Sequence, residues 1–516
     1  MNKKMPRDRM HPALFLPSII LLIVSLTFLD SRTIALLIPS LLVLPFFIAS
    51  ILQRPPRKED VGKIIERESA ELVALLSVEL HRGGTLESAM EFVSETDGLR
   101  SAGYMRRILW EVETRIRPNV SEALLSLISE NHVDHSTSMA IQLLMAAATA
   151  APGDERTDLI EEANRIAVDG MRSTMERYAA SLNLPGMTVF AVGVVLPLIC
   201  ISLLPMMALG ESMNISGGYN ILAMAGMLVL PLLVAIYIHS VLAKSPMPQR
   251  KVISLRSMGS FIAGSVFVIV LHVGGIDPVP ALVLGLSPAC LIAYIVTKKE
   301  HDRSLKRVDM DDAMLENLVR LGSSIRSGKD LEGALRSNPP QGEAGALTAS
   351  FLSSLENSRL SWNEALRQIF WELPSSTVAL YRAIFRSANK DSVEAGMLSI
   401  RMGKYMHQCR NVREDVMNRM RSLTDMMSGT STVFAPLVLG MGLSLGSPLG
   451  GQSVDHWTIL LTGLYLVELS ALTSWISSSL KDLDGKETVA HLMSLHLPIT
   501  ITVFIISWWA LSMGVW

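Results

Sequence analysis

Long apolar stretches alternate with two long polar segments along this chain. Nine stretches lack strong charges over enough residues to span a bilayer, or nearly so. They are Leu14–Leu29, Thr33–Leu52, Leu184–Leu209, Tyr219–Ala243, Met258–Val273, Val279–Thr297, Met426–Leu445, Trp457–Leu480 and Val489–Trp516. The pattern predicts a polytopic membrane protein with about nine transmembrane helices, in which the two polar segments form soluble domains.

Both polar segments show the spacing of amphipathic helices. Apolar residues share one helix face in each segment, namely Leu72, Leu75, Leu76 and Leu80, and then Leu315, Leu318, Gly322 and Ile325. Neither segment holds a sustained strand pattern. We therefore expect an all-α protein with two helical-bundle domains.

A tight turn follows this helix in each segment. The turn has a glycine at the left-handed C-cap position, an N-cap residue two positions later, and a glutamate near the positive end of the next helix. These positions are Gly83, Thr85 and Glu87 in the first segment, and Gly328, Asp330 and Glu332 in the second.

The two halves of the chain repeat one another. Residues 71–90 match 316–335 at a register of 245 without a gap, and later matches follow at registers of 242 and 244. The later matches join 119–124 to 361–366, where both segments resemble capping boxes, and Thr188–Ala191 to Thr432–Ala435. A period this long indicates a duplicated domain. Each copy has two spans, a soluble domain and two more spans, and the ninth span is an addition to the second copy.

Positive charge in the short connections predicts the orientation. The N-terminal tail, the link 244–256 and the turn 481–486 carry lysines or arginines, whereas the alternate turns hold one positive residue, Arg32. The N-terminus and both soluble domains are therefore expected in the cytoplasm, and the C-terminus outside the cell membrane. The expected parts are a transmembrane hairpin (1–52), a first cytoplasmic domain (53–183), a transmembrane pair (184–243), a basic link with a transmembrane pair (244–297), a second cytoplasmic domain (298–428) and three transmembrane helices (429–516).

The two soluble domains differ in charge. Residues 53–183 carry 15 basic and 22 acidic side chains, whereas residues 298–428 carry 20 and 17. Ordinary solvated helix faces would explain this difference. Alternatively, the copies diverged to meet different partners or different parts of one partner.

No reactive motif is complete. Residues 322–330 resemble a phosphate loop, but the glycines are one residue too far apart and Asp330 replaces the hydroxyl that holds magnesium. His132 and His135 lack further metal ligands nearby and read as solvated surface. The three cysteines, Cys200, Cys290 and Cys409, are far apart and read as reduced. We expect no catalytic residue, metal or cofactor, and no enzyme.

One ionisable residue lies in the middle of a predicted span. Glu468 sits within Leu464–Ser470, where a charge is costly and normally faces protein or water. His491 and His496 of the last span are candidate neighbours. Glu468 is either a protonated structural residue, a polar contact for a partner's transmembrane helix, or a proton site of a transporter.

The repeated helix-turn pattern resembles the F domain of type II secretion and type IV pilus platform proteins. The fusion of two such units resembles archaeal members, including the archaellum platform protein, and the tight-adherence platform pair of bacteria joined in tandem. The resemblance implies a membrane scaffold that binds a cytoplasmic hexameric secretion ATPase and lifts pilin-like subunits into a filament. It implies no nucleic acid, and it leaves a homodimer open.

Arginines before the seventh span are candidates for contacting the ATPase. Arg410, Arg413 and Arg421 share one helix face, while Arg401, Lys404 and Arg419 fall towards the other. A well-solvated connecting helix explains the same residues.

Two other classes compete with the platform reading. A secondary transporter of two parallel repeats would place a polar site near the bilayer midplane. Glu468 suits such a site, but the equivalent region of the first copy, around Met224, is apolar. A membrane enzyme would need a reactive constellation, which the sequence does not supply.

Overall fold

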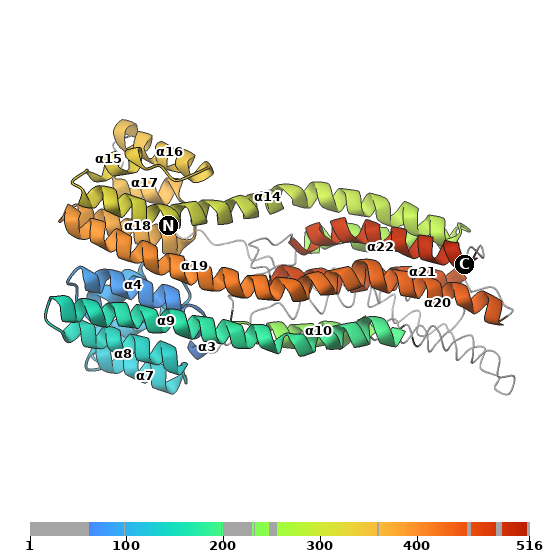
Figure 1. The fold of residues 1–516 in the computed structure, drawn as a ribbon, viewed down its shortest axis with the longest axis horizontal. Coiled ribbons are helices and arrows are strands. Elements are labelled where there is room, and N and C mark those ends of the chain that lie inside the picture. Colours follow the sequence, from blue (N-terminus) through green and yellow to red (C-terminus); the bar gives the residue numbers. More distant parts are fainter. Residues whose placement is uncertain are drawn as a thin grey trace.

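The computed structural model describes residues 61–96, 99–197, 199, 230–231, 233–246, 255–358, 361–450, 456–480 and 488–512. These residues form helices and no strand, which confirms the all-α expectation. Short helices gather at one end of an elongated molecule and long helices extend from them to the other end (Figure 1). The first two predicted spans lie outside the described residues.

The first helical unit, residues 61–181, is a bundle of short helices closed by one long helix. Its elements are α3 (Val61–Arg67), α4 (Ser69–His81), α5 (Leu86–Ser94), α6 (Ser101–Glu113), α7 (Val120–Glu130), α8 (His135–Thr149) and α9 (Asp154–Ser181). It continues into α10 (Asn183–Phe190) and the π-helical segment η2 (Ala191–Val195). The apolar helix Leu233–Leu242 and α13 (Leu255–Val273) follow.

The second helical unit, residues 298–428, includes the ends of two long helices and four short helices between them. It begins in α14 (Pro278–Arg326) and ends in α19 (Ser392–Gly429), with α15 (Leu331–Ser337), α16 (Glu343–Ser358), α17 (Trp362–Ile369) and α18 (Ser375–Ala388) between them. The π-helical segment η3 (Thr430–Phe434) follows α19. The remaining elements are α20 (Ala435–Gly450), α21 (His456–Leu480) and α22 (Thr488–Ser512).

Long helices connect the two ends of the molecule without a break. The 49 residues of α14 include both the predicted span 279–297 and the first helix of the second unit. Residues 392–444 likewise form one helical run through α19, η3 and α20. The helical backbone is therefore continuous from the polar end into the apolar end.

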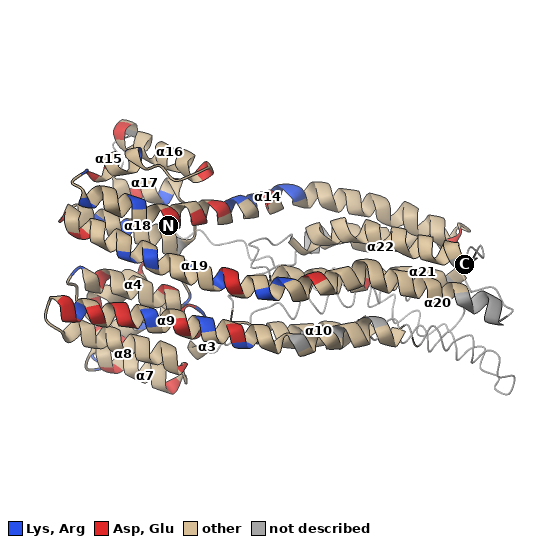
Figure 2. Cartoon of the chain, viewed as in Figure 1, with Lys and Arg blue, Asp and Glu red and all other residues tan. Residues whose placement is uncertain are grey.

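Charge divides the molecule in the same way. Figure 2 shows lysine, arginine, aspartate and glutamate gathered at the end with short helices, while the opposite half carries few charges. Among the described residues, four helices are long and apolar enough to cross a membrane, in Pro278–Arg326, Ser392–Ser444, Thr458–Leu480 and Thr488–Ala510. The fold thus agrees with a membrane protein.

One hydrophobic core unites the two helical units. Leu72, Leu76 and Met90 of the first unit belong to the same buried cluster as Leu318 and Phe385 of the second. A second buried cluster fills the apolar half and centres on α21, from Ile459 to Leu480. Burial of aliphatic side chains away from water, at about 25 cal/mol per Å², stabilises the cluster at the polar end.

Candidate functional site

The repeated turns have matching backbone geometry. Gly83 and Gly328 adopt φ of 77° and 94°, the left-handed region expected at these helix ends. Thr85 Oγ1 accepts from the Ser88 amide at 3.3 Å, and Asp330 Oδ2 accepts from the Gly333 amide at 3.4 Å. Glu87 and Glu332 are exposed in the first turns of the helices that follow. Both turns therefore present polar groups at the surface.

The predicted capping box forms in the second copy, whereas the first copy shows only the N-cap half of it. The Asn119 side chain accepts from the Glu122 amide at 2.7 Å, and Ser361 Oγ accepts from the Glu364 amide at 3.3 Å. The Glu364 carboxylate accepts in return from the Ser361 amide. The local sequence signals thus start equivalent helices, α7 and α17.

Opposite charges pair across the two helical units. Arg401 of α19 lies 3.4 Å from Glu161 of α9, and Arg419 lies 3.4 Å from Glu176 of the same helix. Each pair is partly exposed and contributes no more than about 1 kcal/mol. Some of the excess acidic side chains of the first unit therefore pair with basic side chains of the second unit.

A buried contact lies beside these ion pairs. The Tyr405 hydroxyl of α19 donates to the Ala70 carbonyl of α4 at 2.9 Å. His81, at the end of α4, lies 3.4 Å from Arg401. Burial, with the nearby Arg401 and Arg156, lowers the pKa of His81 to about 4. The imidazole is therefore neutral at the interface near pH 7.

The three arginines proposed to contact an ATPase have different surroundings. Arg410 binds Asp312 of α14 at 3.1 Å and Glu414 at 2.7 Å, so it joins α19 to α14. Arg413 and Arg421 are exposed. Arg421 forms no ion pair with any other described residue. The exposed part of this face therefore consists of Arg413 and Arg421.

The helices from both units meet α21 through π-helical segments. The Tyr465 hydroxyl donates to the Gly193 carbonyl of η2. Thr473 and Ser431 of η3 share a hydroxyl hydrogen bond of 2.9 Å. Because a π-helical turn is uncommon and often marks a functional site, its presence in both copies beside one helix singles out α21.

Glu468 lies between these two contacts on α21. Its side chain is 3% exposed, and neither carboxylate oxygen has a hydrogen-bond partner among the described residues. His491 instead bonds the Thr297 hydroxyl at 3.2 Å and stacks on His301 at 4.2 Å. Glu468 is therefore a buried carboxyl group that the described part of the chain leaves unpartnered.

The structure places the phosphate-loop-like sequence, the histidine pair and two of the three cysteines. Gly322, at the start of the sequence that resembles a phosphate loop, is helical and packs against Gly396 of α19. No group of three metal-ligating side chains occurs among the described residues, His132 and His135 included. Cys290 and Cys409 are free cysteines, while Cys200 lies outside the described residues.

Comparison with protein-family models, characterised proteins and solved structures finds no match to this chain.

The sequence did not predict several polar contacts that the structure brings together. The ion pairs between the two helical units were missed because they depend on how the copies pack. The opposite charge balances were the one signal that pointed to them.

Proposed function

We propose that this chain is the membrane platform protein of a type IV filament or type II secretion-like machine. In this role it couples a cytoplasmic hexameric secretion ATPase to the assembly of pilin-like subunits. The chain then acts as a scaffold and performs no catalysis of its own. The proposal extends the resemblance of the repeated helix-turn pattern.

One observation carries the proposal. Two helical units share one core at the polar end, and helices from both units run into the apolar half and touch α21. Packed helices are stiff, so a displacement imposed on the polar end is passed along α9 and α19 to this central helix. A platform that converts ATPase movement into movement of membrane subunits needs such a connection.

The ATPase contact is proposed on the exposed part of the second unit. Arg413 and Arg421 supply positive charge there, and the turn at Gly328 offers a second exposed contact. Replacing Arg413 and Arg421 by Glu should weaken ATPase binding at low salt, because a charged contact is screened as salt rises. Arg410→Glu is better tested separately, since it also breaks the pair with Asp312.

Glu468 is the proposed polar contact for the transmembrane helix of a pilin-like subunit. A partner able to donate a hydrogen bond would satisfy its buried carboxyl group. A secondary transporter is the second candidate, because the same buried carboxyl group could carry a proton. The transporter predicts proton-coupled uptake by the purified chain in vesicles, whereas the platform predicts none.

The nine-span topology is proposed together with this function. It places residues 53–183 and 298–428 in the cytoplasm and the C-terminus outside. A reporter fused after Ser428 should be active in the cytoplasm, and one fused after Trp516 should not. Finding both fusions on the same side of the membrane would contradict the topology.

Deletion of the gene tests the function directly. The deletion strain should lack surface filaments or secreted pseudopilus subunits in electron microscopy, and the full-length gene should restore them. A neighbouring gene for a secretion ATPase, with genes for short proteins bearing one apolar N-terminal helix, is expected beside it. Normal filaments and normal secretion in the deletion strain would contradict the proposal.

A further inference from the structure

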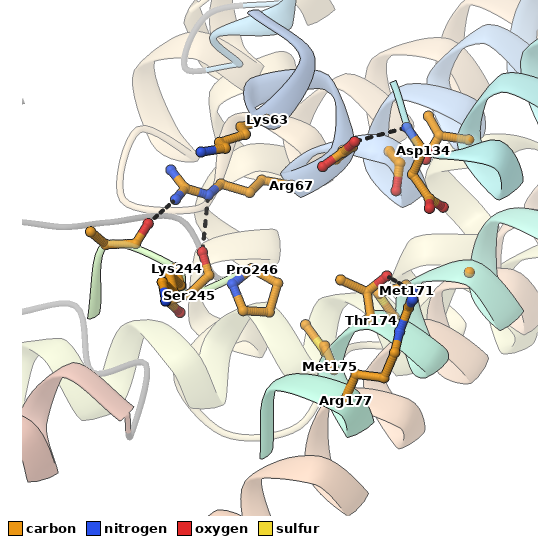
Figure 3. Close-up of a pocket in the computed structure, with 15 residues that line it drawn as sticks. Lys63, Arg67, Asp134, Met171, Thr174, Met175, Arg177, Lys244, Ser245 and Pro246 are labelled. Carbon is orange, nitrogen blue, oxygen red and sulfur yellow. Dashed lines mark hydrogen bonds between the residues drawn. The ribbon is translucent and has the colours of Figure 1, made fainter. Parts of the chain in front are cut away.

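A cavity of about 320 Å³ lies where the first helical unit meets the end of an apolar helix. It is bounded by α3, by residues 170–177 of α9 and by Ala243–Pro246 (Figure 3). Ala243 directly follows the apolar helix Leu233–Leu242. The cavity therefore lies at the level where polar chain gives way to apolar chain, which is the headgroup level of a bilayer.

Basic side chains outnumber acidic ones in the lining. The basic side chains are Lys63, Arg67, Arg177 and Lys244. The lysines are exposed and form no ion pair with any described residue. Two acidic side chains, Glu66 and Asp134, also line the cavity, so the lining carries a net charge of about +2 at neutral pH.

Backbone amides engage both acidic side chains. Glu66 accepts from the Asp134 amide at 2.8 Å, and Asp134 accepts from the Ser136 amide at 3.2 Å. Arg67 donates to the carbonyls of Ala243 and Ser245 at 3.3 and 3.1 Å and so fixes the end of the apolar helix (Figure 3). The arrangement leaves the ammonium groups of the lysines as the charges best placed to meet an anion.

A small apolar cleft of about 20 Å³ lies further along the same two stretches of chain. Residues 170–177 line the cavity and residues 182–186 line the cleft, while 243–246 line the cavity and 237–242 the cleft. At a rise of 1.5 Å per residue, the two sites are on the order of 10 Å apart. The remaining cleft residues, from α19 and α21, are also apolar: Leu423, Met427, Ile476 and Leu480.

We propose that the cavity binds the phosphate headgroup of an anionic membrane phospholipid, whose acyl chain begins beside the apolar residues that line the cleft. The basic lining attracts the phosphate, and the apolar residues of the cleft lie next to it, as an acyl chain lies next to the phosphate in a phospholipid. Such a lipid contacts α3, α9 and the end of the apolar helix together. It therefore ties the first helical unit to the membrane, whatever the function of the whole chain.

The test uses the full chain purified in neutral detergent. Short-chain phosphatidylglycerol, short-chain phosphatidylcholine and soluble glycerol phosphate are each added, and the thermal unfolding temperature is followed. Phosphatidylglycerol should raise the unfolding temperature by several degrees, because it binds the folded state, and the rise should shrink as salt increases. Phosphatidylcholine and glycerol phosphate should give little or no rise at the same concentration.

Variants locate the effect. Lys63→Gln with Lys244→Gln should lose most of the rise, Arg177→Gln should reduce it, and Lys63→Arg with Lys244→Arg should retain it. Arg172→Gln with Lys299→Gln removes two exposed cations outside the cavity and should behave as the unaltered chain. An unchanged response of the first double variant, or of Arg177→Gln if the former does not fold, would overturn the proposal. An equal rise with phosphatidylcholine would also overturn it, and an equal rise with glycerol phosphate would replace the lipid by a soluble phosphate.

Discussion

Phe190 and Phe434 face each other with ring centroids 6.0 Å apart, and they occupy the same position in the two copies of the repeat. Phe190 directly precedes η2 and Phe434 ends η3. The pair therefore places equivalent positions of the two copies side by side at the level of the π-helical segments.

A thiol cross-link tests this pairing. Phe190→Cys and Phe434→Cys, in a chain whose three native cysteines are replaced by serine, should be joined rapidly by a short bifunctional thiol reagent. The product is measured as a shift in electrophoretic mobility after cleavage between the two halves. Phe190→Cys with Met441→Cys, placed two turns further along, should react slowly. Equal rates for the two pairs would contradict the pairing of Phe190 with Phe434.

Partly buried Asp311 should make the second helical unit sensitive to pH. Burial raises the pKa of Asp311 to about 6 from 3.8, against the opposing effect of the hydrogen bond from Thr377. Since the folded pKa is raised, this group's contribution to stability is complete below pH 3.8 and is lost as pH rises through 6. The loss amounts to about 3 kcal/mol.

Replacing Asp311 by Asn removes this titration. The variant should unfold at a higher temperature than the unaltered chain at pH 8, and the difference should vanish near pH 4. Asp309→Asn is a suitable control, because Asp309 is exposed on the same helix. A stability difference that stays constant from pH 4 to pH 8 would show that Asp311 does not titrate in this way.

Close helix packing in the second unit depends on glycine. A Cβ atom at Gly322 would lie 2.6 Å from the Gly396 carbonyl oxygen, so Gly322→Ala must push α14 away from α19. The expected loss is about 1–3 kcal/mol in the free energy of unfolding. Gly103→Ala is the matched control, because nothing lies within 4 Å of its added Cβ. That control should be neutral or stabilising by up to about 1 kcal/mol, and equal losses in both variants would contradict the packing argument.

Substitutions of Glu468 should affect folding and filament assembly differently. Glu468→Gln keeps hydrogen-bonding capacity at similar size and should retain filament assembly. Glu468→Leu removes a buried carboxyl group that has no hydrogen-bond partner among the described residues, which relieves about 1–3 kcal/mol, so it should insert and fold at least as well. The Leu variant should nevertheless lower the number of filaments counted by electron microscopy. Normal filament numbers in that variant would reduce Glu468 to a structural residue.

Local features of the fold could be predicted from the sequence, and features that depend on packing could not. Gly83 and Ser361 act through neighbours within a few residues, so their turn and cap were readable. That α14 is one unbroken helix could not be predicted. Its first part is apolar and its second part is charged, so the sequence reads as a span followed by a separate helix. The π-helical segments leave no signal in composition.

The candidate site shows the same division. Helical spacing separated Arg401 and Arg419 from Arg413 and Arg421, but it could not say which face meets the other copy. The structure turns Arg401 and Arg419 towards α9. Glu468 was readable because a carboxyl group within an apolar span is costly wherever its neighbours lie.

Co-purification from the native cells tests the platform proposal most directly. The tagged full-length chain, extracted in mild detergent at low salt, should recover a secretion ATPase and short proteins with one apolar N-terminal helix, identified by mass spectrometry. The variant Arg413→Glu with Arg421→Glu should recover less ATPase, while Arg172→Glu should recover the usual amount. Extraction of the folded chain with neither an ATPase nor such short proteins would contradict the platform function.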